Sequence, residues 1–189
     1  MQNTSTYRQP AAASKTREMV LCALFTVLIA VGAFIKINIP VVPFTLQFLF
    51  TMMAGILLGG RLGAISVTVY MALGLAGLPI FAEGGGIWYL AKPSFGYIIG
   101  FAVAAYVTGK MIETASKLTI PRLLAANFTG LFIVYAVGMV YYYIVCNFII
   151  NTPIGVWPLF LYCFILAVPG DICLCILAAF LGKRLRPLL

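Results

Sequence analysis

The sequence contains no histidine and very little charge. Only 8% of its 189 residues are charged and only four are acidic, whereas ordinary soluble domains are about 25% charged. The absence of histidine removes the commonest proton relay and metal ligand and excludes a Ser/His/Asp catalytic set. The chain also has no Gly-x-x-x-x-Gly-Lys-[Ser/Thr] phosphate loop, which excludes ATP hydrolysis by that route. We therefore expect a protein that is not an enzyme and that needs no metal or cofactor.

Cysteine is present, but its placement argues against a disulfide framework or a metal site. All five cysteines lie in apolar runs: Cys22, Cys146, Cys163, Cys173 and Cys175. The last two are two residues apart and would point to different sides of a helix. We interpret all five as small packing residues.

Long hydrophobic runs dominate the sequence. Hydrophobic residues make up 63% of the chain, and the mean hydropathy is +1.11. A spanning helix needs about 20 apolar residues, so this length allows six helices in one domain. A membrane β-barrel would show short segments of alternating hydrophobicity, but the runs here are continuous. The sequence therefore predicts an all-α, multi-pass membrane protein.

The expected membrane domain covers 19–182, between a polar N-terminal tail (1–18) and a basic C-terminal tail (183–189). The expected helices lie at about 19–35, 44–60, 62–78, 94–111, 123–148 and 156–182. The second and third are short for full spans, so five helices with one re-entrant pair is an alternative.

The positive residues indicate the orientation of these helices. The net charge is +8, but the lysines and arginines stand between apolar runs rather than on one polar face, which argues against a nucleic-acid partner. With six spans, ten of the 12 fall on the side of the two tails, and only Lys36 and Lys92 fall on the other. Cytoplasmic loops carry the excess of Lys and Arg. Both termini are therefore expected to be cytoplasmic.

Asp171 is the only acidic residue in the last apolar run, and it directly follows Pro169-Gly170. A carboxylate at membrane depth costs at least ~2.5–3.5 kcal/mol on insertion scales and normally faces a cavity. Proline breaks the regular helix, and a broken helix at this depth lines protein or water. We interpret Asp171 as a ligand-reading group on a kinked last helix. The alternative is a structural aspartate bonded to a neighbouring helix.

The segment 79–93 is expected to be the longest connection on the external side, and it is not hydrophilic as a plain surface loop would be. It contains Phe81, Trp88, three successive glycines, and the charged Glu83 and Lys92. This composition favours a lid that folds back over a cavity. An interfacial belt of aromatic residues is the alternative.

These residues together describe a binding site for a small, mostly apolar ligand with polar ends. Asp171 would accept ligand N–H groups, Trp88 or Phe81 would cover the apolar part, and Lys92 is free to pair with an external carboxylate. Neutral hydrogen bonds would come from Thr45, Gln47, Ser94 and Tyr97. An ion channel would more typically show rings of charge or a carbonyl filter, and the sequence has neither.

The first expected helix carries small residues at helical spacing, which let another helix approach closely. They are Cys22, Ala23, Thr26, Ala30 and Ala33. Packing within the chain is one interpretation, and docking of a partner membrane protein is the other.

Five motifs, in their order and spacing over about 19–182, resemble the BioY family, the biotin-binding S components of energy-coupling factor (ECF) transporters. The motifs are Pro43-Phe44-Thr45-Leu46-Gln47, Gly59-x-x-x-Gly63, the run from Tyr70 to Ala82, the run from Pro93 to Phe101, and Pro169-Gly170-Asp171. The resemblance implies six helices in a prokaryotic plasma membrane and capture of biotin from outside. It also implies a transmembrane coupling (T) component and two cytoplasmic ATPases as partners.

The resemblance further implies that the first helix docks on the T component through small residues, here Ala23, Ala30 and Ala33. Val27 departs from that pattern. We assign the ureido N–H groups of biotin to Asp171 and its carbonyl to Gln47 or Asn147. Trp88 and Tyr97 would enclose the bicyclic ring, and the loop with Glu83 and Lys92 would close above the valerate tail.

Two departures from the family affect these assignments. The family often has lysine three residues after the aspartate, and here that position is Leu174. Many relatives read Gly-Pro-Thr-Gly-Gly-Tyr where this chain reads Lys92-Pro93-Ser94-Phe95-Gly96-Tyr97, so Asn151 or backbone donors are alternatives to Lys92 as the carboxylate clamp. The alternative functions are a membrane scaffold or assembly subunit, and an S component for another vitamin.

Overall fold

The apolar runs form helices, and the computed structural model describes residues 15–37, 44–115 and 118–188. The helices are α1 (Lys15–Phe34), α2 (Gln47–Leu58), α3 (Gly60–Leu75), α4 (Phe95–Glu113), α5 (Ile120–Ile144), α6 (Val156–Phe160) and α7 (Val168–Leu185). Shorter helical turns are η1 (Ile87–Ala91), η2 (Val145–Ile149), η3 (Leu161–Ile165) and η4 (Arg186–Leu188). The expected all-α fold is thereby confirmed. Most of the predicted N-terminal tail (1–18) and residues 38–43 of the expected connection between the first two helices lie outside the described residues.

Four helical stretches are long and apolar enough to cross a membrane: Lys15–Phe34, Phe95–Glu113, Ile120–Ile149 and Val156–Leu185. Two apolar helices, Gln47–Leu58 and Gly60–Leu75, are shorter. At a rise of 1.5 Å per residue, the 12 residues of α2 extend roughly 18 Å, against a hydrocarbon core of about 30 Å. The chain is a multi-pass membrane protein by these criteria, with two helices below the ordinary spanning length.

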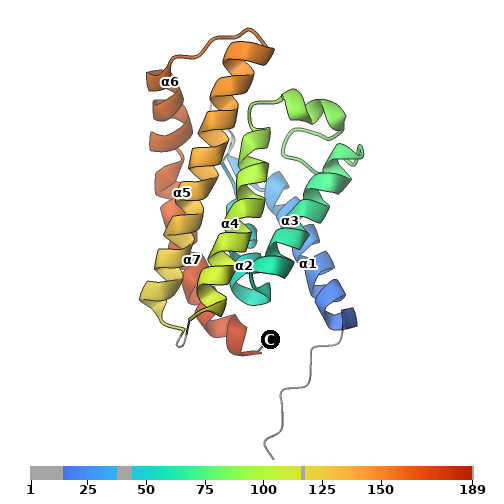
Figure 1. Cartoon of the computed structure of the whole chain (residues 1–189), viewed down its shortest axis with the longest axis vertical. Helices are drawn as coiled ribbons and strands as arrows, with labels where there is room; N and C mark the ends of the chain where they lie inside the picture. Colours follow the sequence, from blue (N-terminus) through green and yellow to red (C-terminus); the bar gives the residue numbers. More distant parts are fainter. Residues whose placement is uncertain (1–14, 38–43, 116–117, 189) are drawn as a thin grey trace, which may run out of the picture.

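The helices stand side by side as a bundle around α4, which contacts α2, α3 and α5 (Figure 1). The start of α1 and the C-terminus lie at one end of the bundle, at the bottom of the view. The segment with η1 and the connection from α5 to α6 lie at the opposite end. The two ends of the bundle are therefore distinct, one with the start of α1 and the end of α7 and one with these connections.

Small residues bring the helices into close contact. A Cβ atom on Gly63 of α3 would stand 2.9 Å from the backbone of Gly55 in α2. A Cβ atom on Gly100 of α4 would stand 3.0 Å from the Cα atom of Val134 in α5. Between α2 and α3, Gly59 turns the chain with a φ of 86°, a conformation that favours glycine. Glycine at these positions permits the close helix packing.

A two-stranded antiparallel ribbon connects α1 to α2. Its strands are β1 (Lys36–Ile37) and β2 (Phe44–Thr45), with Lys36 opposite Thr45. The backbone N–H of Leu46 donates to the carbonyl oxygen of Ile35 at 3.1 Å and closes the ribbon onto the end of α1. The ribbon fixes the entry of the chain into α2.

The last apolar run is broken as expected from Pro169. The π-helical turn η3 ends at Ile165, two turn residues follow, and α7 begins at Val168 with Pro169 in its first turn. Proline is tolerated there because the first N–H groups of a helix have no partner within it. Asp171 therefore lies in the first turn of α7, directly after a break within the bundle.

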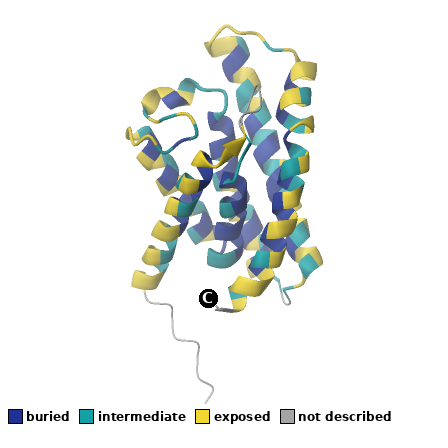
Figure 2. Ribbon diagram, turned by 180° about the vertical axis from the view of Figure 1, so that it is seen from behind, coloured by how far each residue is buried: buried dark blue, intermediate teal, exposed yellow. Residues whose placement is uncertain are grey.

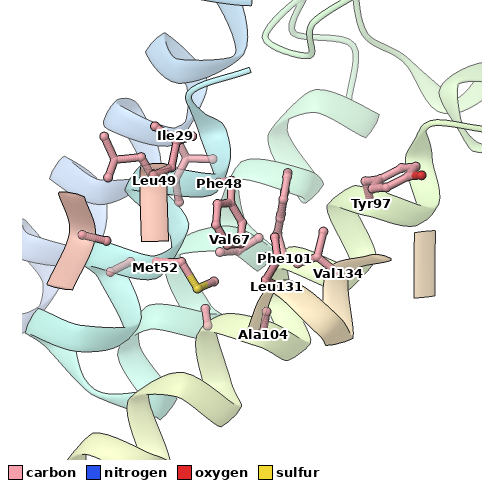
Figure 3. Close-up of a cluster of buried hydrophobic side chains, with 14 of the residues drawn as sticks. Ile29, Phe48, Leu49, Met52, Val67, Tyr97, Phe101, Ala104, Leu131 and Val134 are labelled. Atoms are coloured by element: carbon pink, nitrogen blue, oxygen red, sulfur yellow. The ribbon is translucent and has the colours of Figure 1, made fainter. Parts of the chain in front are cut away.

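Buried side chains gather between the helices, and exposed ones follow the outward faces (Figure 2). Figure 3 shows part of this core, in which Phe48, Met52, Phe101 and Leu131 pack together while the hydroxyl of Tyr97 is directed away from them. Tyr97 therefore lies at the edge of the apolar core, and it also lines the cavity described in the next section.

Candidate functional site

A cavity of about 650 Å³, its open mouth included, lies between β2, α2, α4, α5 and α7. Its lining is mostly apolar with a few placed polar groups, as is usual for small-molecule sites. Its lining residues are Phe44, Thr45, Gln47, Phe48, Ala82, Tyr89, Ser94, Tyr97, Ile98, Phe101, Val134, Tyr135, Cys163, Ala167 and Asp171. Five of the residues predicted from the sequence are therefore brought together: Asp171, Thr45, Gln47, Ser94 and Tyr97.

Asp171 is 8% exposed and lines this cavity rather than the outside of the bundle. The hydroxyl of Tyr135, on α5, donates to Asp171 Oδ2 across 2.5 Å. The other carboxylate oxygen, Oδ1, makes no hydrogen bond with the described residues, and it is not among their fully enclosed polar atoms. A neighbouring helix therefore occupies one oxygen of Asp171, and the second is available to the cavity.

Tyr97 is the second polar group without a conventional partner. It is 8% exposed, and among the described residues its hydroxyl has no hydrogen-bond partner. The sulfur of Cys163 interacts with it, and sulfur is a weak hydrogen-bond acceptor. Buried polar groups are normally hydrogen-bonded. The Tyr97 hydroxyl is thus a fully enclosed polar group without a conventional partner, on a residue that lines the cavity.

Gln47 and Thr45 are held in place on the α2 side of the cavity. Gln47 Nε2 donates to the hydroxyl oxygen of Tyr70 at 2.8 Å, and Tyr70 in turn donates to the carbonyl oxygen of Ile80 at 3.1 Å. The Thr45 hydroxyl lies 3.4 Å from Gln47 Oε1. One N–H of Gln47 is thus engaged within the protein, and its second remains for a ligand.

The segment 79–93 forms a wall of the cavity through Ala82 and Tyr89. Burial raises the pKa of the Tyr89 hydroxyl above its ordinary value, so at neutral pH this group stays protonated and able to donate. Lys36 Nζ donates to the carbonyl oxygen of Ala82 across 2.6 Å, which ties the wall to β1.

Two predicted aromatic residues of this segment are directed elsewhere. Phe81 is fully buried, and its ring packs against Gly74 and the rings of Tyr70 and Tyr89. It anchors the segment instead of covering the cavity. Trp88 is 85% exposed, and it is not part of the cavity lining. These aromatic side chains were predicted from composition, which carries no information about the direction in which each ring turns.

The predicted charges of the same segment pair with each other. Lys92 Nζ lies 2.8 Å from Glu83 Oε2, and both side chains are close to half exposed. Neither residue lines the cavity. The ion pair connects the two ends of the segment.

The two predicted asparagines also lie outside the cavity lining. Asn147 Nδ2 donates to the carbonyl oxygens of Tyr143 at 3.0 Å and Ile154 at 3.3 Å. Asn151 is exposed, with a φ of 51°, in the connection between η2 and α6. In this structure Asn147 stabilises that connection, and Asn151 forms its turn.

Sequence reasoning missed the cavity residues on α5, above all Tyr135. A tyrosine in a long apolar run is ordinarily a packing residue, and no local pattern indicates that it faces Asp171, 36 positions away. The one signal that could have found it is physical: a buried carboxylate needs a donor, and few donors occur in the apolar runs.

The predicted docking residues of α1 differ in their exposure. Ala23 is exposed and Ala30 is half-buried, whereas Ala33 is fully buried within the chain. The exposed stripe of α1 also contains Val20, Val27 and Val31. In this structure Ala23 and Ala30 are thus accessible to another helix, whereas Ala33 is not accessible.

Comparison with known proteins identifies the family. The model of the BioY family matches residues 3–189. A probable biotin transporter BioY of Lysinibacillus sphaericus is 48% identical over 90% of this chain and 87% of its own length. The biotin transporter BioY of Thermotoga maritima is 40% identical over 65% of this chain and 72% of its own length.

Among solved structures, the crystal structure of the S-component for biotin from an ECF-type ABC transporter is similar, with a TM-score of 0.75. It is 29% identical, and the match covers 95% of each chain. Family model, relatives and fold agree, and the chain belongs to the BioY family.

Proposed function

We propose that this chain is the biotin-binding, substrate-specificity (S) subunit of an ECF vitamin transporter and captures biotin from outside the cell. The observation that carries the proposal is the cavity beside Asp171, in which one carboxylate oxygen is open to a ligand. Relatives named biotin transporters and the S-component structure support biotin as the ligand.

The chemistry of the cavity suits the ureido group and the bicyclic ring of biotin. A cyclic urea offers two N–H donors and one carbonyl acceptor. Asp171 supplies an anionic acceptor for an N–H group, and Tyr97 or the second N–H of Gln47 supplies a donor for the carbonyl. Apolar walls for the bicyclic ring come from Phe48, Ile98, Phe101 and Val134. The ligand contacts are thus a few charge-assisted and neutral hydrogen bonds within an apolar enclosure.

We also propose that all six helical segments cross the membrane, with both termini in the cytoplasm. The shared end of α1 and the C-terminus supports one side for the two termini, and the excess of Lys and Arg on that side supports the cytoplasm. The short helices α2 and α3 are packed against α1 and α4, so neighbouring helices shield their ends from lipid. The cavity then opens on the external side of a prokaryotic plasma membrane.

Transport requires partners, because this chain has no phosphate-binding loop. The family context supports a transmembrane T component and two cytoplasmic ATPases as the source of energy. The exposed stripe of α1 around Ala23 and Ala30 is the proposed docking surface for the T component, because small residues allow close helix contact in a membrane. The subunit itself binds and releases the vitamin.

The direct test is a titration of the purified protein in detergent with labelled biotin, with thiamine and riboflavin as competitors. We expect saturable binding of one biotin per chain that neither competitor displaces. Displacement by another vitamin would reassign the ligand within the same architecture. Absence of binding to any of the three in a monodisperse, folded sample would favour a scaffold subunit.

Lys36 is a better candidate than Lys92 for the biotin carboxylate. Lys92 is neutralised by Glu83, whereas within the described residues Lys36 forms no ion pair and contacts the cavity wall at Ala82. We expect Lys36→Met to raise the Kd for biotin roughly 5- to 20-fold, the usual range for loss of one partly exposed charged contact. Lys92→Met is the matched control and is expected to change Kd less than twofold.

The methyl ester of biotin separates this role of Lys36 from a loss of structure. The ester has no carboxylate, so its affinity is expected to be the same for wild type and Lys36→Met. A larger loss with Lys92→Met than with Lys36→Met would return the carboxylate to Lys92.

A further inference from the structure

The carboxylate of Asp171 is held by a neutral group and not by a cation. Within residues 15–37, 44–115 and 118–188, the two ion pairs are Glu83–Lys92 and Glu113–Lys110, and neither includes Asp171. The residue one helical turn after Asp171 is Leu174, an apolar side chain that is 8% exposed. The hydroxyl of Tyr135 is thus the one side-chain donor to Asp171 in this part of the chain.

This single bond determines which part of the carboxylate a ligand can reach. The Tyr135 hydroxyl occupies Oδ2, and Oδ1 is left without a partner among the described residues. The ring of Tyr135 is itself held by neighbours: it meets the ring of Tyr97 edge-on at 6.0 Å and the ring of Phe164 edge-on at 5.4 Å. A short bond from a fixed ring limits rotation of the carboxylate about its last torsion.

The same ring contact relates two polar groups of the site that lack a conventional hydrogen-bond partner, Oδ1 of Asp171 and the enclosed hydroxyl of Tyr97. Tyr97 packs against Tyr135 at an interplanar angle of 86°, and the Tyr97 hydroxyl is unpartnered. The acceptor Oδ1 of Asp171 and the hydroxyl of Tyr97 are therefore positioned through one residue. An acceptor and a donor held at a constant spacing match a cyclic urea, which presents N–H and C=O groups in a rigid ring.

We propose that Tyr135 is the positioning residue of the site: by engaging Oδ2, it presents Oδ1 of Asp171 to the ureido N–H of the ligand and thereby selects a neutral urea. This inference rests on the proposed function, since it takes biotin as the ligand. In this proposal the neutral hydroxyl of Tyr135, on α5, orients the carboxylate of Asp171, on α7.

The test compares Tyr135→Phe with Tyr143→Phe, which removes an exposed hydroxyl from the same helix. Each variant is titrated with biotin and with 2-iminobiotin, in which a guanidinium replaces the urea. We expect Tyr135→Phe to raise the Kd for biotin about tenfold, the effect of one hydrogen bond to a charged group, and Tyr143→Phe to leave it unchanged. A guanidinium can engage both oxygens of a freely rotating carboxylate, so Kd for iminobiotin is expected to rise threefold or less.

A purely structural role would weaken both ligands equally, and this result would overturn the proposal. A further check is Tyr135→Phe in an Asp171→Asn background. Hydrogen bonds between neutral groups are about half as strong as those to a charged group. The additional rise in the Kd for biotin is therefore expected to shrink to two- or threefold. An undiminished tenfold loss would show that Tyr135 acts independently of Asp171.

A second variant leaves Tyr135 untouched. Asp171→Glu keeps the negative charge but moves the carboxylate by one methylene, away from the geometry that the tyrosine fixes. We expect a loss of biotin affinity of at least tenfold. Wild-type affinity in Asp171→Glu would contradict the need for a positioned oxygen, whereas failure of the wild-type protein to bind biotin would instead reject the proposed function.

Discussion

Asparagine in place of Asp171 is expected to raise the Kd for biotin roughly 10- to 150-fold. A hydrogen bond to a charged group contributes about 1.5–3 kcal/mol, and each 1.4 kcal/mol is a factor of about ten in Kd. The substitution preserves the shape of the side chain but removes the negative charge at the oxygen that faces the cavity. The measurement is equilibrium binding of labelled biotin to purified protein in detergent.

The effect should lie mainly in the dissociation rate, because the lost contact forms deep in the cavity and not at its mouth. Glu18→Gln, a matched carboxylate-to-amide change in the first turn of α1, is the control and is expected to leave Kd unchanged. Wild-type affinity in Asp171→Asn would remove Asp171 from the ligand contacts and favour its interpretation as a bond between α5 and α7.

The structure bears on the alternative that Asp171 only joins α5 to α7. Asp171 does bond to a neighbouring helix, through Tyr135, and it also lines a cavity. The two interpretations drawn from the sequence are therefore compatible, since each describes one carboxylate oxygen. A single buried acid can be both a contact between helices and a ligand contact when its two oxygens face different partners.

The elements of this fold are predictable because membrane helices depend on local composition. Continuous apolar runs, the break at Pro169 and the turn between the second and third helices are all visible along the chain, and each appears in the structure close to its expected position. The ends of helices are less predictable: α1 already begins at Lys15, within the segment predicted as a tail. Charged residues can extend a helix beyond the membrane without a change in period.

Site residues could be predicted from the sequence where their chemical group is rare in the chain, and could not be predicted where their position depends on packing. A buried carboxylate such as Asp171 stands out in an apolar run because its cost demands a partner. Phe81 and Trp88 lie in one short segment, yet one is fully buried against Gly74 and the other is 85% exposed. Their directions follow from the tertiary fit of the segment, and no periodicity in the sequence encodes that fit.

The close contact between α4 and the turn that joins α2 to α3 leads to the largest expected effect on stability. Gly109 of α4 lies directly against Gly60, and a Cβ atom on Gly109 would overlap the Gly60 backbone nitrogen and Cα atom. Backbone cannot move aside as a flexible side chain does, so α4 would have to shift as a whole. That shift would also strain the hydrogen bond from the Gly60 N–H to Glu113 Oε1, now 2.8 Å long.

Gly109→Ala therefore has two opposite effects on the stability of the fold. Alanine in place of glycine within a helix gains up to about 1 kcal/mol of helix propensity, whereas overpacking of a tight interior costs about 1–3 kcal/mol and occasionally more. Contact with rigid backbone places this site at the upper end of that cost. We expect a net loss of about 2 kcal/mol or more, which corresponds to a fall in Tm of at least about 4–8 °C for a domain of this size.

Thermal unfolding in a single detergent, followed by tryptophan fluorescence and by loss of the monodisperse peak, measures this difference. Gly155→Ala is the matched control, because its φ is −71° and the nearest atom to the added Cβ, on Pro158, lies at an ordinary 3.4 Å. The control is expected to be neutral or slightly stabilising, since alanine restricts the unfolded chain more than glycine does. A Gly109→Ala protein as stable as wild type would mean that α4 can move away from Gly60 at little cost, and that close helix contact at this end of the bundle is not what holds α2, α3 and α4 together.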